Sequence, residues 1–323
     1  MHNSKTQTTP EGAVVFFGTP YFAARCLQEL HHGGIPIAGV VTAPDRPAGR
    51  GQKLNVSPVK QYALEHQLPL AQPERLKSPE FLACLRSWNP RLQVVVAFRM
   101  LPEIVWNAPP LGTLNLHASL LPAYRGAAPI QWAIIRGETV TGVTTFRLRH
   151  EIDTGDLIGR QSVAIGHDTD AGTLLDQLLE AGAPLLRRDV AAVLGGTALY
   201  SPQSAGSGEF PHAPKLTPET GRINWQSAAA DVHNLVRGLA PTPGAHTQYR
   251  GQPLKILRTR KLEGAPALPA GQTSLHDGAW LVGCGDAPLS IELLQPAGSR
   301  AMSAMDFLRG RSAMQSVRLG EGG

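Results

Sequence analysis

The chain has 323 residues, of which 42% are hydrophobic and 17% are charged, so it exceeds one typical domain and can build two ordinary hydrophobic cores. This balance excludes a disordered chain, and no apolar run approaches the length that crosses a bilayer. The formal net charge of +5 permits attraction to a polyanion but is too small to predict one.

The first residues and the cysteines indicate a reducing location. Residues 1–12 are polar and lack the apolar stretch of a secretory signal. Cys26, Cys84 and Cys284 are widely spaced, which predicts neither a disulfide framework nor a zinc motif. We therefore expect packing roles for these thiols and a cytoplasmic protein.

Strand-like and helix-like segments alternate in the first part of the chain. Apolar runs of strand length lie at residues 14–17, 37–42 and 94–98, and helix-like stretches lie at residues 23–31 and 59–66. This alternation predicts an α/β fold, in which helices flank a mostly parallel sheet.

A basic segment at residues 45–53 interrupts this pattern. It places Arg46 and Arg50 among prolines and glycines, so it has little to bury and predicts an exposed, mobile loop. Taken alone, a solvated charged loop is the simpler interpretation. The two glycines of the segment lack the third glycine and acidic partner of a dinucleotide-binding fingerprint.

Residues 112–117 predict a strand with two polar side chains on one face. Leucines occupy one side of the strand, and Asn115 and His117 occupy the other. A Pro/Gly-rich loop over residues 119–129 follows and leads into a helix-like stretch. Ligands bind beside such strand ends in open α/β sheets, so this edge is a candidate site.

A carboxylate completes the candidate site. Asp153 lies in a turn-like segment after the predicted strand at residues 143–148. Acyl transfer to an amine passes through a tetrahedral intermediate that bears an oxyanion. Asn115 can donate to that oxygen, His117 can move protons near neutral pH, and Asp153 can orient the imidazole.

Each of these residues also has an ordinary interpretation. The chain has 11 histidines, and a surface or packing role is the commoner one for any of them. An aspartate before a turn usually bonds nearby backbone amides or caps a helix. These residues alone leave both interpretations open.

The second part of the chain has a different composition. Pro, Gly, Ser and Gln cluster at residues 201–215, after a helix-like pattern at residues 174–194, and predict a linker. A helix is predicted at residues 228–239, and short strands are predicted at residues 247–249, 254–258, 279–282 and 289–294. Short strands with frequent turns predict a small β-barrel.

This second part also holds a group of cations: Arg237, Arg250, Lys255, Arg258, Arg260 and Lys261. They could form a basic face toward nucleic acid. Scattered surface cations are the ordinary alternative, and both interpretations remain open.

Two motifs surround the candidate site: LNLHASLLPAYRGAAPI at residues 114–130 and DTGD at residues 153–156. Together they resemble the methionyl-tRNA formyltransferases, a branch of the folate-dependent formyltransferases. Further motifs extend the resemblance over nearly the whole chain: FGTP at 17–20, VVTAPDRPAGRG at 40–51, SPVKQ at 57–61, APKL at 213–216, GRINW at 221–225 and PTPGA at 241–245. It is weakest after about residue 258.

The resemblance implies a reaction and roles for residues. Asn115, His117 and Asp153 match the catalytic trio of the family. The tetrahydrofolate-binding loop matches Ser119, Leu120, Leu121 and Pro122. The implied reaction transfers the formyl group of 10-formyltetrahydrofolate to the α-amino group of methionine on initiator tRNA, for translation initiation, and requires no metal.

The resemblance also implies an architecture. It predicts a Rossmann-like catalytic domain over residues 1–203, a linker over residues 204–216, and an OB-like β-barrel that binds tRNA over residues 217–323. In relatives the basic loop grips the acceptor end of tRNA, which makes Arg46 and Arg50 the expected contacts. We expect a monomer that meets folate and initiator methionyl-tRNA and no membrane.

Two segments depart from the commonest family pattern. RLRHEID at residues 147–153 stands where many relatives have Met-Asp-x-Gly-Leu-Asp, and FRMLP at residues 98–102 stands where Tyr-Gly is frequent. Both leave the trio intact. They put in question the contacts beside Asp153 and beside the expected pterin pocket.

Three other functions remain open. A folate-dependent formyltransferase acting on a sugar nucleotide or on glycinamide ribonucleotide would share the trio, and a 10-formyltetrahydrofolate hydrolase would admit water in place of the amine. A noncatalytic RNA-binding protein would retain the site as a relic. The basic loop and second domain favour the tRNA formyltransferase.

Overall fold

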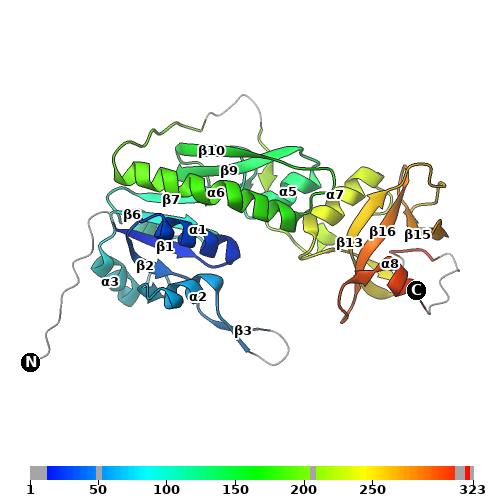
Figure 1. Ribbon diagram of the computed structural model, residues 1–323, viewed down its shortest axis with the longest axis horizontal. Coiled ribbons are helices and arrows are strands. Elements are labelled where there is room, and N and C mark those ends of the chain that lie inside the picture. Colours follow the sequence, from blue (N-terminus) through cyan, green and yellow to red (C-terminus); the bar gives the residue numbers. More distant parts are fainter. Residues whose placement is uncertain (1–12, 49–52, 204–208, 310–316, 321–323) are drawn as a thin grey trace, which may run out of the picture. The chain divides into compact units, whose positions relative to one another are not determined.

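The computed structural model describes residues 13–48, 53–203, 209–309 and 317–320 (Figure 1). The predictions made for residues 1–12 and for Arg50 lie outside these ranges. The chain forms two compact units, and each is composed of three segments. The first comprises Met1–Arg125, Gly142–Val163 and Gln177–Pro211, and the second comprises Gly126–Thr141, Ala164–Asp176 and His212–Gly323. The contiguous domain bounds given above stay a prediction.

The first unit is built on a seven-stranded sheet with the order β10-β9-β7-β6-β1-β2-β5. Its strands are β1 (Val14–Gly18), β2 (Ile37–Val41), β5 (Leu70–Ala71), β6 (Leu92–Val96), β7 (Thr113–His117), β9 (Val140–Arg147) and β10 (Leu157–Ala164). Strands β7, β6, β1, β2 and β5 run parallel, and β9 runs antiparallel to β7. The predicted mostly parallel sheet is confirmed.

Helices pack beside this sheet (Figure 1). They are α1 (Tyr21–His32), α2 (Pro58–Glu65), α3 (Pro79–Trp88), α4 (Glu103–Trp106) and α6 (Ala171–Leu194). Both α2 and α3 begin with a serine whose hydroxyl accepts a backbone N–H, followed by a proline at the first helical position. Helix α1 buries an apolar face of Phe22, Ala23, Cys26, Leu27 and Leu30.

Strand β6 ends earlier than the apolar pattern predicts. All of its residues are buried, as the sequence predicts for a strand covered on both faces. Ala97 follows with φ of 45° and turns the chain away from the ladder. Phe98 therefore lies outside the strand, edge-on to Phe17 with ring centroids 5.8 Å apart. The strand predicted at residues 94–98 therefore lies two residues earlier in the chain, at Leu92–Val96.

The basic segment is only partly a loop. Strands β3 (Arg46–Ala48) and β4 (Lys53–Asn55) pair antiparallel as a short ribbon. The loop prediction is wrong for these residues because the backbones of the two strands pair with each other. Residues 49–52 lie outside the described ranges.

The second unit is built on an antiparallel sheet with the path β12-β13-β16-β15-β14, and β17 pairs with β16. Its strands are β12 (Ala245–Tyr249), β13 (Gln252–Lys261), β14 (Thr273–His276), β15 (Ala279–Gly283), β16 (Pro288–Pro296) and β17 (Met302–Ser303). Its helices are α5 (Pro129–Ile135), a 3₁₀ turn at Glu219–Gly221, α7 (Ala229–Leu239) and α8 (Ala304–Leu308). A two-stranded pair joins β8 (Arg125–Gly126) and β11 (His212–Ala213).

The core of this second sheet is aromatic. Trp225, Tyr249, Trp280 and Phe307 are buried together, and Tyr249 meets Phe307 edge-on at 5.1 Å. The predicted short strands are confirmed. Among the described strand pairs none joins β12 to β14, so closure into a barrel stays a prediction.

Two of the three cysteines take the predicted packing role, and Cys84 is half-buried. All are free, and Cys26 and Cys284 are buried. Burial raises the pKa of the Cys284 thiol to about 12, which keeps it neutral and unreactive.

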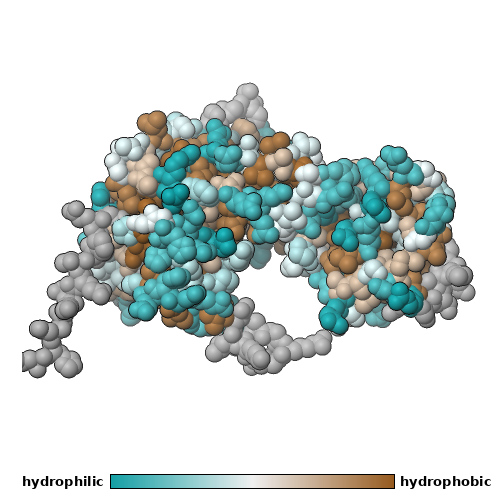
Figure 2. Space-filling view, viewed as in Figure 1, coloured by the Kyte–Doolittle hydropathy of each residue, from teal (hydrophilic) through white to brown (hydrophobic). Residues whose placement is uncertain are grey.

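Hydrophobic and hydrophilic residues are interspersed on the visible face (Figure 2). In Figure 2 hydrophobic residues form small separate patches, such as individual exposed side chains produce. No helix within the described ranges is both long enough and apolar enough to cross a membrane.

Candidate active site

Strand β7 places the amide and the imidazole. It lies between β6 and β9, and Leu114 and Leu116 are buried, as the alternation predicts. Asn115 is half-buried, and His117 at the end of the strand is 7% exposed. The two polar side chains are two residues apart on a strand and therefore share a face.

His117 lies between two acceptors. Its Nε2 donates to the backbone oxygen of Tyr124 at 2.9 Å, and its Nδ1 lies 3.8 Å from a carboxylate oxygen of Asp153. The second distance exceeds a hydrogen bond but lies within the range of an ion pair. A doubly protonated ring would direct both N–H groups at acceptors. The structure thus brings the predicted histidine and aspartate together.

The turn that carries Asp153 has a constrained backbone. Asp153 has φ of 55°, a left-handed conformation that is uncommon for a residue with a side chain. A Cβ on Gly155 would lie 1.6 Å from the backbone oxygen of Arg147, so only glycine fits there. The same turn returns a hydrogen bond from the Arg147 N–H to the backbone oxygen of Asp156.

The side chain of Thr144 forms hydrogen bonds with the backbone of the loop predicted to bind folate. The Thr144 hydroxyl donates to the backbone oxygen of Ser119 at 2.7 Å and accepts the Leu121 N–H at 3.1 Å. Ser119 and Leu121 are buried, whereas Leu120 and Pro122 are half-buried. The four predicted residues therefore divide into two that support the loop and two that can meet a ligand.

Sequence reasoning missed two supports of this loop. Thr144 lies opposite His117 in the register of β9, and Arg160 donates to the Leu121 backbone oxygen at 3.3 Å. A threonine in a β-branched strand is ordinary, and an arginine after a turn is equally so. No local signal marks either residue, because both act through the fold.

The structure describes one of the two predicted tRNA contacts, and both stay predictions. Arg46 is exposed at the start of β3, and Arg50 lies outside the described ranges. Burial, and then the positive charge of Arg46, lower the pKa of the nearby Arg99 guanidinium. Arg99 belongs to the segment that departs from the family pattern. An anion at this position would relieve the repulsion between the two cations.

One cation of the group predicted in the second unit is not available to a basic face. Arg237 is 8% exposed and donates to the backbone oxygens of Gly166 and Thr169, so it cannot belong to a basic face. Arg258 and Arg260 both pair with Glu292.

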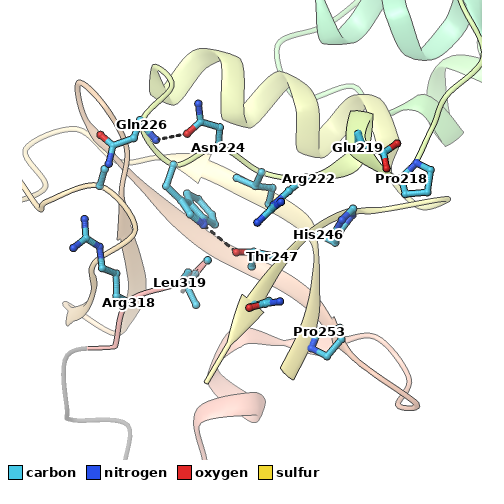
Figure 3. Close-up of a pocket in the computed structure, with 15 residues that line it drawn as sticks. Pro218, Glu219, Arg222, Asn224, Gln226, His246, Thr247, Pro253, Arg318 and Leu319 are labelled. Atoms are coloured by element: carbon cyan, nitrogen blue, oxygen red, sulfur yellow. Dashed lines mark hydrogen bonds between the residues drawn. The ribbon is translucent and has the colours of Figure 1, made fainter. Parts of the chain in front are cut away.

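A pocket of about 780 Å³ opens in the second unit (Figure 3). Trp225 and Leu319 are buried beneath it, and the indole of Trp225 donates to the Thr247 hydroxyl at 3.1 Å. Arg318 and His246 lie on opposite sides of the pocket. Pattern reasoning did not anticipate this site, since its residues come from distant segments.

A histidine cluster joins residues 166–169 to α7. His167, Asp168 and His233 bring ligand atoms within 4.8 Å of one another. His233 is buried and already bonds the Thr259 hydroxyl at 3.0 Å and the His167 backbone oxygen at 3.3 Å. These contacts are those of a docked loop, and we assign no ion to them.

Comparison with known proteins identifies the family. The family model described as Formyl transferase matches residues 12–190, and the model described as Formyl transferase, C-terminal domain, matches residues 215–312. The chain belongs to the formyl transferase family. It is a transferase with the α/β architecture predicted above.

A relative of nearly the same length is the Methionyl-tRNA formyltransferase of Bacteroides fragilis, which is 46% identical over 314 residues, covering 95% of this chain and 97% of the relative. The resemblance to methionyl-tRNA formyltransferases is thereby confirmed.

Solved structures share the fold at low identity. HypX from Aquifex aeolicus has a TM-score of 0.66 and 19% identity, and the match covers 93% of this chain and 48% of the HypX chain. The N-formyltransferase from Helicobacter canadensis has a TM-score of 0.63 and 16% identity, and the match covers 88% of this chain and 98% of that one. HypX has also been solved in complex with tetrahydrofolic acid, with a TM-score of 0.61 and 18% identity over 93% of this chain and 47% of that one.

Proposed function

We propose that this formyltransferase moves the formyl group of 10-formyltetrahydrofolate to the α-amino group of methionine on initiator tRNA. The observation that carries the proposal is the 46% identity, over 95% of the chain, to a protein named methionyl-tRNA formyltransferase. Asn115 and His117 on one strand face, with Asp153 close to His117, support the same chemistry. The proposed product would be used in translation initiation, in the cytoplasm.

The residues present suit a folate donor. Leu120 and Pro122 offer half-buried apolar surface, and the amide of Asn115 is also half-buried. An aromatic pteridine needs such a combination of apolar contact and a few polar partners. The donor supplies the activated formyl carbon, and the chain supplies the groups around it.

In the proposed reaction the amine nitrogen bonds to the formyl carbon, and the carbonyl electron pair moves to oxygen. Asn115 would donate an amide hydrogen to this oxygen. His117 would transfer the proton lost by the amine to the leaving nitrogen as the old carbon–nitrogen bond breaks. Asp153 would hold the imidazole and balance its charge.

We also propose how the acceptor tRNA is held. Arg46 would meet acceptor phosphates, and its repulsion with Arg99 supports an anion at that position. In the second unit, the guanidinium and imidazole groups around the Trp225 pocket suit an RNA backbone and its unpaired bases. Arg50 stays a predicted contact.

The test is formylation by purified protein with 10-formyltetrahydrofolate. Methionyl initiator tRNA, free methionine, uncharged tRNA and no acceptor would be compared in parallel. We expect formyl-methionyl-tRNA only with the charged tRNA. Folate turnover without an acceptor would instead indicate a hydrolase, and absence of turnover in every mixture would favour a binding protein.

A further inference from the structure

The ring of His117 lies between two segments, and each has an unusual backbone conformation at the residue that faces the ring. Tyr124, whose carbonyl accepts from the ring, has φ of 60°, and Asp153, whose carboxylate faces the ring, has φ of 55°. Side-chain-bearing residues keep this conformation only when their surroundings hold it. The position of the imidazole therefore depends on whatever holds these two segments.

One side chain bonds both segments. The amide nitrogen of Gln203 donates to the backbone oxygens of Asp153 at 2.8 Å and Gly155 at 2.9 Å. Its amide oxygen accepts from Arg125, from Nε at 3.2 Å and also from Nη2. Arg125 directly follows Tyr124. Both donors and both lone pairs of the amide are used, so its orientation is fixed.

The chain around Gln203 is itself anchored within the first unit. Ser201 exchanges two backbone hydrogen bonds with Leu157, at 2.8 and 2.9 Å. Beyond residues 204–208, the backbone oxygen of Pro211 accepts from the Tyr124 N–H. The amide thus extends from a fixed backbone toward both holders of His117.

We propose that Gln203 is a positioning residue for formyl transfer. It clamps the turn of Asp153 and the segment of Tyr124 and Arg125 together, and so sets the approach of the carboxylate to the imidazole. The inference rests on the roles proposed above for His117 and Asp153. The rate depends strongly on the position of catalytic groups, since a displacement of about 1 Å can lower it by about 100-fold.

The clamp needs an amide because its nitrogen donates to one segment and its oxygen accepts from the other. A glutamate has the same shape but no donors, and it would direct a carboxylate oxygen at two backbone carbonyls while still accepting from Arg125. The Gln203→Glu variant therefore releases the Asp153 side of the clamp alone. Gln295→Glu is a matched control, because the Gln295 amide also donates to a backbone oxygen, that of Ser299, in the second unit.

The test measures kcat and KM for formylation in a double-variant cycle. We expect Gln203→Glu to lower kcat by about 10- to 100-fold, with KM for both substrates within about twofold, and Gln295→Glu to match the wild type. In an Asp153→Asn background, Gln203→Glu should have little further effect, because both changes disable the same pair. Gln203→Met, which keeps the length and loses the amide, should behave similarly.

Three results would overturn the clamp: a wild-type kcat in both Gln203 variants, an undiminished effect in the Asp153→Asn background, or a rise in KM without a fall in kcat. A long-range proton–nitrogen NMR spectrum of the histidines gives a readout that needs no turnover. The His117 ring signals should move in Gln203→Glu and stay in place in Gln295→Glu. An inactive wild type with this spectral change would refute the proposed function and not the clamp.

Discussion

At the scale of single residues, the candidate site depends on a few atoms with little freedom. His117 is 7% exposed, and the structure fixes one of its nitrogens on the Tyr124 carbonyl. Asn115 extends from the same strand face. Removal of either group should therefore affect the reaction more than the binding of a large substrate.

We predict that His117→Ala lowers kcat by at least about 100-fold, since general acid–base groups contribute at least that much. The dissociation constant for methionyl-tRNA should stay within about twofold, because the buried ring offers little surface to RNA. Single-turnover formylation and filter binding measure the two quantities. Weakened tRNA binding with normal turnover would contradict the assignment.

A second residue-scale prediction concerns Gly155. A methyl group at this position would lie 1.6 Å from the backbone oxygen of Arg147, and backbone cannot move aside cheaply. Gly155→Ala should lower both the unfolding free energy and kcat, because the Asp153 turn must shift. Gly195→Ala is the control, since its Cβ comes no closer than 3.3 Å to another atom. If Gly155→Ala matched the wild type in urea unfolding and in kcat, the turn would be able to accommodate the methyl group, and the prediction would be wrong.

At the scale of elements, the site lies on the interior strand β7 and is supported by neighbouring elements. Strand β9 contributes Thr144 beneath the loop predicted to bind folate, and the strand pairs directly with β7. Helix α7 has a comparable role in the second unit, where its Arg237 donates to backbone oxygens of residues 166–169. In both places one buried side chain satisfies polar backbone atoms of a loop.

We predict that Thr144→Val destabilises the loop over residues 119–122. The hydroxyl serves one carbonyl and one N–H, and leaving buried polar groups unpaired costs about 1–3 kcal/mol. The KM for the folate donor should rise, whereas Thr144→Ser should restore most of the stability and affinity. Steady-state kinetics with varied donor concentration provide the measurement. Equal KM values in Val and Ser variants would show that the hydroxyl is unnecessary.

A second element-scale prediction concerns pH. Burial lowers the pKa of His233 below 6.5, and the neighbouring Arg237 and His167 lower it further, while the His167 carbonyl and Asp168 oppose them. Below about pH 6.5 the unfolded chain binds a proton that the folded chain resists, so the folded state loses stability as the pH falls. The contribution is fully present above that pH.

The measurement is urea unfolding between about pH 7 and pH 5.5. The free energy of unfolding should fall less steeply for His233→Gln than for the wild type, because the variant has no such group. His276→Gln changes an exposed histidine at the end of strand β14 and serves as the comparison variant. Identical slopes for all three proteins would contradict the prediction.

At the scale of the whole molecule, the net charge of +5 is modest, so tRNA attraction must come from placed cations. Arg46 is exposed, whereas Arg237 is buried and donates to backbone oxygens. Binding of a nucleic acid through phosphates weakens as salt rises, in proportion to the number of phosphates neutralised.

We predict that Arg46→Ala reduces the slope of log affinity against log salt by about one unit, as loss of one phosphate contact does. The dissociation constant for methionyl-tRNA, measured at several salt concentrations, tests this. Arg91→Ala removes a cation of equal charge that is also exposed, and it should leave the slope unchanged. Equal slopes for Arg46→Ala and the wild type would remove Arg46 from the interface.

The sequence by itself determined the α/β class, most strands and helices, and the identity of the candidate trio. Hydrophobic periodicity is local, and the motif around His117 is contiguous over residues 114–130. Even so, Ala97 ended β6 early and the ribbon of β3 and β4 replaced a predicted loop. Backbone conformation at a single residue and pairing between strands are poorly encoded in local composition.

Only the tertiary structure decided how the loop over residues 119–122 and the Asp153 turn are held. Thr144 lies 27 residues beyond His117, and Gln203 lies 50 residues beyond Asp153, in a stretch whose composition signals only a linker. It also showed that Arg237 is buried, unlike the exposed Arg250, Arg258 and Arg260 of the same predicted group. Hydrogen bonds of this kind join distant segments, and their partners follow from the packing of the chain, which no short window of sequence contains.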